Sequence, residues 1–216
     1  MQYPLPETIG NPELFVGREE EFEYLNEWLG NIPKRLSIST VILARRKSGK
    51  TAILERVFNQ CWSDMSLGII PFYISLSETN EWLQDFALKY YQTFASHYIS
   101  YFERNEKIVK NLLSFHQIRE YAVDHSIEML IEDLDALQEY KADSRVVPMW
   151  ETAITDPRRF ASIFDQRILV IIDEFQYFSD YIFLDTEHTN HYYTMPGSYH
   201  HPVESRYAPM LQQENI

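Results

Sequence analysis

The chain is poor in cysteine, in basic residues and in long apolar runs, and each shortage excludes a class of protein. A single cysteine, Cys61, excludes an internal disulfide and is typical of a reducing compartment. No apolar run reaches the ~18 residues that a membrane-spanning helix needs. The first residues carry neither the basic start nor the apolar stretch of a signal peptide. We therefore expect a cytoplasmic protein with no membrane-bound part.

Basic residues are outnumbered, because 19 Lys and Arg stand against 32 Asp and Glu, and the formal net charge is −13. A protein that binds nucleic acid normally carries a basic face that neutralises the phosphates. Direct binding of DNA or RNA by this chain is therefore not expected. Binding of a nucleotide is still compatible with the charge, since it requires only local amides and one or two lysines.

What the chain does contain is enough apolar material for a core: 45% hydrophobic and 15% aromatic residues over 216 positions. Apolar periodicity predicts strands at 38–44, 69–74 and 168–172, with Pro71 keeping the start of the second out of the ladder. It predicts helices at 18–29, 49–60, 81–102, 114–122, 127–140 and 150–164. We expect one α/β domain over 1–216, with three layers, a mainly parallel sheet and a helical insertion at 79–140.

A phosphate-binding pattern follows the first predicted strand. It consists of Ala44, Arg45, Arg46, Lys47, Ser48, Gly49, Lys50 and Thr51, with alanine where the first glycine is usual. Such a loop turns backbone N–H groups and the positive end of the next helix toward one point, where an anion binds. The pattern predicts that this loop, with Ala52 after it, binds ATP. Lys50 is expected to reach the β- and γ-phosphates, and the Thr51 hydroxyl to coordinate Mg²⁺.

An acidic pair ends the third predicted strand, where a run of aliphatic residues leads into Asp173 and Glu174. Buried carboxylates are costly unless they have partners. A P-loop enzyme supplies those partners, because one acid binds the metal shell and the other polarises the attacking water. We expect Asp173 to bind Mg²⁺ and Glu174 to activate water, with Lys50 as the second catalytic residue.

Together with a Phe-Val-Gly-Arg-Glu segment at 15–19, these motifs resemble the prokaryotic and archaeal-type AAA-like ATPases. That family belongs to the P-loop ATPases with a catalytic glutamate and is related to origin-recognition and STAND NTPases. The resemblance implies a three-layer P-loop NTPase core and ATP hydrolysis. It also implies that Phe15, Val16 and Gly17 lie beside the adenine. For Phe15, a hydrophobic staple before the helix at 18–29 is an equal alternative.

The C-terminal part differs from this family. The resemblance implies a further strand that carries a polar sensor residue and lies between the phosphate-loop strand and the Asp-Glu strand. An arginine finger and a helical lid would follow. The sequence predicts instead a helix within 203–211 and then the polar residues 212–216, with no such strand. We therefore expect either a truncated or frameshifted ATPase, or a sheet that another segment, a protein partner or self-association completes. In both cases we expect weak turnover.

Two functions remain: an ATP-hydrolysing switch or motor subunit, and a regulatory module that binds ATP with negligible hydrolysis. A nucleotide kinase ranks last, because the helical insertion offers no recognisable acceptor site. Four histidines in a turn-rich stretch could bind zinc, but no cysteine accompanies them, so a surface loop is the favoured interpretation. They are His188, His191, His200 and His201.

Overall fold

The computed structural model describes residues 2–7, 17–45, 48–192 and 209–215. The helices are α1 (Glu19–Asn31), α2 (Lys50–Ser63), the 3-10 helix η2 (Met65–Leu67), α3 (Leu83–Glu103), α4 (Glu106–Lys110), α5 (Phe115–Asp124), α6 (Glu128–Ala142), α7 (Val146–Ile163) and α8 (Tyr177–Tyr181). The strands are β1 (Thr40–Ala44), β2 (Ile70–Ser75), β3 (Glu81–Trp82), β4 (Ile168–Asp173), β5 (Ile182–Phe183) and β6 (Met210–Asn215). The expectation of an α/β fold is confirmed.

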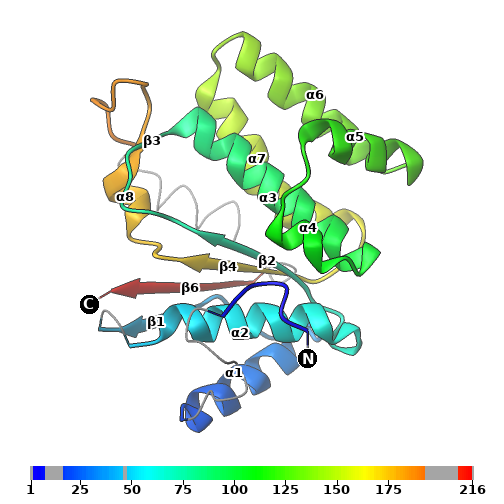
Figure 1. Cartoon of the computed structure of the whole chain (residues 1–216), viewed down its shortest axis with the longest axis vertical. Helices are drawn as coiled ribbons and strands as arrows, with labels where there is room; N and C mark the ends of the chain where they lie inside the picture. Colours follow the sequence, from blue (N-terminus) through cyan, green and yellow to red (C-terminus); the bar gives the residue numbers. More distant parts are fainter. Residues whose placement is uncertain (1, 8–16, 46–47, 193–208, 216) are drawn as a thin grey trace.

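Four parallel strands form the main sheet in the order β1-β6-β4-β2 (Figure 1). A short parallel pair, β3 and β5, lies apart from it. Because the four strands run in one direction, their carboxyl ends meet at one edge of the sheet. The residues at these ends are Ala44, Asn215, Asp173 and Ser75. This edge is where ligands bind in open parallel sheets.

The expectation that the chain has no strand between the phosphate-loop strand and the Asp-Glu strand is wrong. β6 lies there, with Leu211 in register with Thr40 of β1 on one side and with Ile171 of β4 on the other. The predicted helix within 203–211 is wrong for Met210 and Leu211, which are in β6, whereas 203–208 lie outside the described residues. The sequence did not signal this strand because buried parallel strands normally read as apolar runs, and β6 is polar from Gln212 onward.

The start of β2 is also paired, contrary to expectation, because Pro71 is in register with Leu169. β2 is an edge strand, so alternate N–H groups of β2 point away from β4. Ile70 and Leu76 donate to carbonyls at the two ends of β4, at 2.8 and 3.1 Å. The nitrogen of Pro71 therefore faces the open edge, where no ladder hydrogen bond is lost.

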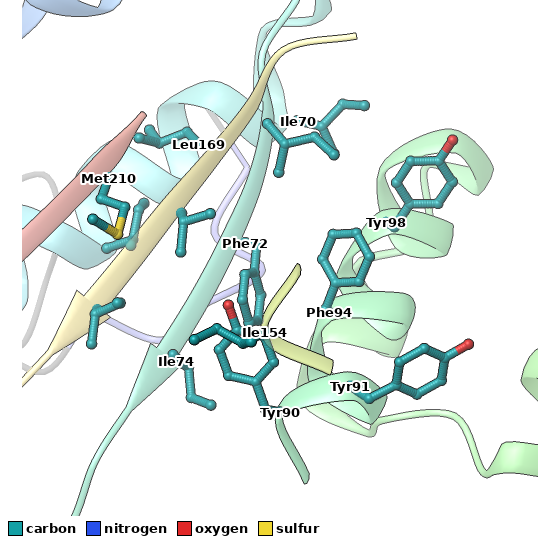
Figure 2. Close-up of a cluster of buried hydrophobic side chains, with 14 of the residues drawn as sticks. Ile70, Phe72, Ile74, Tyr90, Tyr91, Phe94, Tyr98, Ile154, Leu169 and Met210 are labelled. Carbon is teal, nitrogen blue, oxygen red and sulfur yellow. The ribbon is translucent and has the colours of Figure 1, made fainter. Parts of the chain in front are cut away.

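Helices cover the two faces of the sheet. Phe58 of α2 packs edge-on against Tyr73, whereas Phe72, on the opposite face of β2, meets Tyr90 and Phe94 of α3 with ring centroids 5.0 and 5.5 Å apart. Figure 2 shows the β2 side chains turned toward this aromatic row of α3. The aromatic stripe predicted at 81–102 thus forms core, as periodicity suggests.

Five helices, α3 to α7, connect β2 to β4, and they gather on the β2 side of the molecule (Figure 1). The capping box at Ser114 and Gln117 is present at the start of α5. α7 begins at Val146, a turn earlier than expected, and contains Pro157. Within the part of the chain that the structure describes, no helix combines the length and apolar character needed to cross a membrane.

A buried acidic pair links α6 to α7. Asp133 is 3% exposed and Asp156 is fully buried, and Nη1 of Arg159 donates to both, at 2.7 and 2.8 Å. Burial raises the pKa of both carboxyl groups, and the neighbouring Asp133 raises the pKa of Asp156 further. One guanidinium therefore serves two carboxyl groups that cannot both ionise at low cost.

This pair predicts a pH dependence of stability. A carboxyl group with a higher pKa in the folded than in the unfolded chain binds its proton more tightly when folded. The free energy of unfolding is then greatest below the unfolded pKa, about 4, and falls as the pH rises through the folded pKa. Asp156→Asn should reduce that fall above about pH 4, as measured by urea unfolding at several pH values.

Asp143→Asn, at the exposed end of α6, provides the matched control and should keep the slope of the parent chain. An unchanged slope in Asp156→Asn would contradict the prediction.

Candidate functional site

The loop between β1 and α2 turns sharply at Gly49, which has a φ of 84° in the left-handed region. A Cβ built on this glycine would meet no atom within 4 Å, so the backbone conformation, rather than lack of space, favours glycine here. α2 begins directly afterwards, at Lys50. The first turn of a helix presents N–H groups that have no acceptor inside the helix, together with the positive end of the helix dipole.

Lys50 is only 5% exposed, and its ammonium group folds back over the loop. Nζ donates to the carbonyl oxygens of Ala44 and Arg45, each at 3.0 Å. These contacts hold a buried positive charge at the carboxyl end of β1. A cation fixed at a helix N-terminus favours the binding of an anion there.

Thr51, the second residue of α2, reaches across to the end of β4. Its Oγ1 donates to Oδ2 of Asp173 at 2.9 Å, and Asp173 is 2% exposed. A hydroxyl that donates its hydrogen keeps its lone pairs as ligands for a cation. The carboxylate and the hydroxyl thus form a pair of oxygen ligands of the kind that Mg²⁺ uses in proteins.

A second hydroxyl also contacts Asp173. Oη of Tyr73 on β2 donates to the same oxygen, Oδ2, at 3.1 Å. Burial raises the pKa of Tyr73, and the charges of Asp173 and Glu55 raise it further, so the phenol is protonated at neutral pH. The carboxylate is therefore held from two sides, by α2 and by β2.

Glu174, next to Asp173, adopts a left-handed backbone with a φ of 58°. Such a conformation costs a non-glycine residue about 1–2 kcal/mol. Its Oε2 accepts a hydrogen bond from Nε2 of Gln176 at 2.5 Å. Glu174, which follows β4, is therefore held both by its backbone and by a neighbouring amide.

A cleft of about 510 Å³ opens beside the loop, between α1 and the outer edge of β1. Its wall includes Arg18, Tyr24 and Leu43 together with Ser48 and Lys50. Arg18 spans part of it, donating to Glu21 Oε1 at 2.6 Å and to the carbonyl of Ser48 at 2.7 Å. Oγ of Ser48 is buried and has no hydrogen-bond partner among the described residues. Such an unsatisfied hydroxyl is costly unless a ligand or water meets it.

The sequence-predicted residues divide into three groups. The loop residues Ala44, Arg45, Ser48, Gly49, Lys50 and Thr51 lie together, and Thr51 joins them to Asp173, with Glu174 adjacent. Ala52 is buried in α2 behind the loop, and Gly17, with a φ of 83°, precedes Arg18. Phe15, Val16, Arg46 and Lys47 lie outside the described residues.

Three contacts at the site were not predicted. Arg18 belongs to the segment at 15–19, so the motif carried a signal, although nothing indicated a bond to Ser48. Gln176 follows the acidic pair by two positions, which was a weak signal. The sequence did not indicate the contact with Tyr73, because a tyrosine in a strand usually belongs to the hydrophobic core.

No zinc site follows from the histidines. His188 and His191 both lie against the ring of Phe183, and His200 and His201 fall outside the described residues. Over the ranges that the structure covers, no group of three or more His, Cys, Asp or Glu side chains could hold a metal ion. Mg²⁺ at Thr51 and Asp173 needs no such group, since it usually keeps several waters and binds one or two carboxylates together with phosphate.

Comparison of the chain with protein-family models, curated protein sequences and solved structures finds no significant match.

The left-handed backbone at Glu174 predicts that glycine is preferred there. Glu174→Gly should unfold with a free energy about 1 kcal/mol higher than Glu174→Ala, since both lose the contact with Gln176 and only alanine keeps the steric cost. Denaturant unfolding of the two variants measures the difference.

The same pair of substitutions at Glu151, an exposed position inside α7, should give the opposite sign, because glycine weakens a helix interior. Equal stability of the two Glu174 variants would show that the backbone conformation costs nothing.

Proposed function

We propose that this chain binds ATP with Mg²⁺ as a P-loop ATPase domain of the AAA-like type. The observation that carries the proposal is the 2.9 Å hydrogen bond between Thr51, at the start of α2, and Asp173, at the end of β4. A phosphate loop and an acidic strand end are common separately. A triphosphate with its metal requires that a side chain of the loop and a carboxylate at the strand end lie close together, and Thr51 and Asp173 do so.

The phosphates would bind at the β1–α2 loop. Support comes from the left-handed Gly49, the buried ammonium of Lys50 and the unsatisfied Oγ of Ser48. Lys50 would exchange its carbonyl contacts for the β- and γ-phosphate oxygens, which are stronger partners because they are charged. The helix N-terminus adds a favourable field for the same charge.

Thr51 and Asp173 would hold Mg²⁺, Thr51 through a hydroxyl lone pair and Asp173 through its carboxylate. The donor set fits this ion, since both ligands are hard oxygens and one carries the negative charge. When bound, the metal neutralises charge on the β- and γ-phosphates. Thr51 can serve without giving up its hydrogen bond to Asp173, because the bond uses only its hydrogen.

The nucleoside would occupy the cleft beside α1. Its volume of about 510 Å³ is in the range of small-molecule sites, and it is continuous with Ser48 and Lys50 of the loop. Tyr24 and Leu43 offer apolar surface to a base, and Arg18 ties α1 to the loop. Gly17, adjacent to Arg18, and Val16 are the adenine candidates that the family resemblance adds.

Glu174 would orient the attacking water. β6 supplies the strand on which the resemblance expects a polar sensor, and the register pairs its last residue, Asn215, with Ala44 of β1. The reason for expecting weak turnover, a missing strand, does not apply to this sheet.

The alternative is a module that binds ATP without hydrolysing it. One observation favours it: Gln176 occupies an oxygen of Glu174, the side chain that would have to accept a proton or orient water. The oxygen that accepts from Gln176 is less available to a water molecule.

Lys50→Ala should weaken Mg·ATP binding by about 10- to 100-fold, because it removes a charge-assisted contact with phosphate. Isothermal titration calorimetry with a non-hydrolysable ATP analogue measures the affinity. Lys89→Ala serves as the control, since Lys89 lies on α3 and pairs with Glu81. Binding of equal strength in Lys50→Ala and the parent chain would refute the proposal.

Glu174→Gln distinguishes the enzyme from the binding module. For an enzyme, phosphate release should fall about 10²- to 10⁴-fold while nucleotide affinity is retained, because only the general base is lost. For a module, the parent chain should release phosphate no faster than Lys50→Ala. Glu120→Gln, on the exposed face of α5, controls for the charge change.

A further inference from the structure

The carboxylate of Asp173 is held by two hydroxyl groups that come from different elements. Thr51 of α2 and Tyr73 of β2 both donate to Oδ2, at 2.9 and 3.1 Å. A carboxylate oxygen offers about two lone-pair directions, and the two donors account for both. A cation that binds this carboxylate must then use the other oxygen or a bridging water, in an orientation that the two hydroxyls determine.

The backbone of Tyr73 is itself fixed. Tyr73 is in register with Ile171 of β4, and its N–H, which points to the open edge of β2, donates to Nδ1 of His97 at 3.3 Å. Burial lowers the pKa of His97 to about 3, so the imidazole is neutral and Nδ1 accepts at every physiological pH. On the side of β2 where the described sheet has no further strand, His97 of α3 thus accepts the hydrogen bond of this N–H.

Packing explains the ring of Tyr73 but not its hydroxyl. The ring lies edge-on to Phe58 with centroids 6.4 Å apart, a contact that phenylalanine would make equally well. A partly buried hydroxyl is costly without a hydrogen bond. The hydroxyl of Tyr73 donates to Asp173, which is 2% exposed.

We propose that Tyr73 is a positioning residue for the metal site: its hydroxyl orients the Asp173 carboxylate so that Asp173 and Thr51 face Mg²⁺ together. This inference rests on the proposed function. Tyr73 does not contact the nucleotide in this proposal, and it acts only through Asp173. Residues that orient a metal ligand typically change metal affinity by about 10- to 100-fold when they are lost.

Tyr73→Phe removes the hydroxyl and keeps the ring. Two affinities are measured: that of a fluorescent ATP analogue in EDTA, and that of Mg²⁺ titrated onto the protein saturated with the analogue. We expect the Mg²⁺ affinity to fall about 10-fold and the affinity in EDTA to stay within about two-fold of the parent chain.

Tyr91→Phe is the matched control. Its hydroxyl is also buried in a hydrogen bond, to the carbonyl of Leu130 at 3.2 Å, but the side chain points away from the sheet (Figure 2). It should leave both affinities unchanged.

The outcomes separate the two claims. Parental Mg²⁺ affinity in Tyr73→Phe overturns the positioning role and leaves ATP binding intact. Equal losses in EDTA and in Mg²⁺, accompanied by a lower melting temperature, also overturn it, because they indicate a packing role. Absence of binding by the parent chain, with or without Mg²⁺, instead overturns the proposed function itself.

Discussion

The hydrogen bond from Thr51 to Asp173 joins segments 122 positions apart, and the candidate site depends on it. β1 and β4, which deliver the two residues, are not neighbours in the sheet, because β6 lies between them. Parallel strands are about 4.8 Å apart, so the two strand ends are separated by roughly 10 Å. Thr51 nevertheless reaches Asp173, because α2, which follows β1, packs against β2 and β4 and places Thr51 on that side. Without β6 to set this spacing, the same loop and the same acid would not meet in this way.

The two buried charged groups at this edge, Lys50 and Asp173, have partners within the fold. Lys50 has two carbonyl acceptors and Asp173 has two hydroxyl donors, so each buried charge has partners within the fold. Ser48 differs, since its buried Oγ has no partner in the described ranges. A site prepared in this way needs little rearrangement to receive a ligand, because its charges already lie in fixed positions. The net charge of −13 is no obstacle, since Lys50 and Arg18 set the local field.

The sequence predicted those parts of the fold in which local pattern and final environment agree. β4 reads as a continuous apolar run and is buried at every position, and the aromatic stripe of α3 repeats at the helical period. The turn from β1 into α2 was also predictable, because its residues are adjacent in sequence. β6 was not, since its polar residues carry no strand signal and its position depends on two partners far away in the chain.

The site was therefore predictable where one motif supplies the residue, and not where tertiary contacts do. Nothing local distinguishes Tyr73 from a core tyrosine. Its contact with Asp173 depends on the pairing of β2 with β4, which places Tyr73 opposite Ile171 and Ser75 opposite Asp173. The same holds for Glu174. Its left-handed backbone belongs to the turn that leads from β4 toward α8. No residue type in that stretch predicts a left-handed conformation.

The buried ionisable groups of the molecule fall into two cases, which differ in how burial changes their pKa. His97 supports Tyr73 as a neutral acceptor, because burial lowers the pKa of His97 to about 3. The phenol of Tyr73 is kept protonated by burial. The hydrogen bond from the N–H of Tyr73 to His97 therefore does not change over the physiological pH range. The pair Asp133 and Asp156, on α6 and α7, is the opposite case, since burial raises the pKa of both carboxyl groups. A rise in pH should then lower the free energy of unfolding through Asp133 and Asp156, whereas the hydrogen bond between Tyr73 and His97 keeps its protonation states.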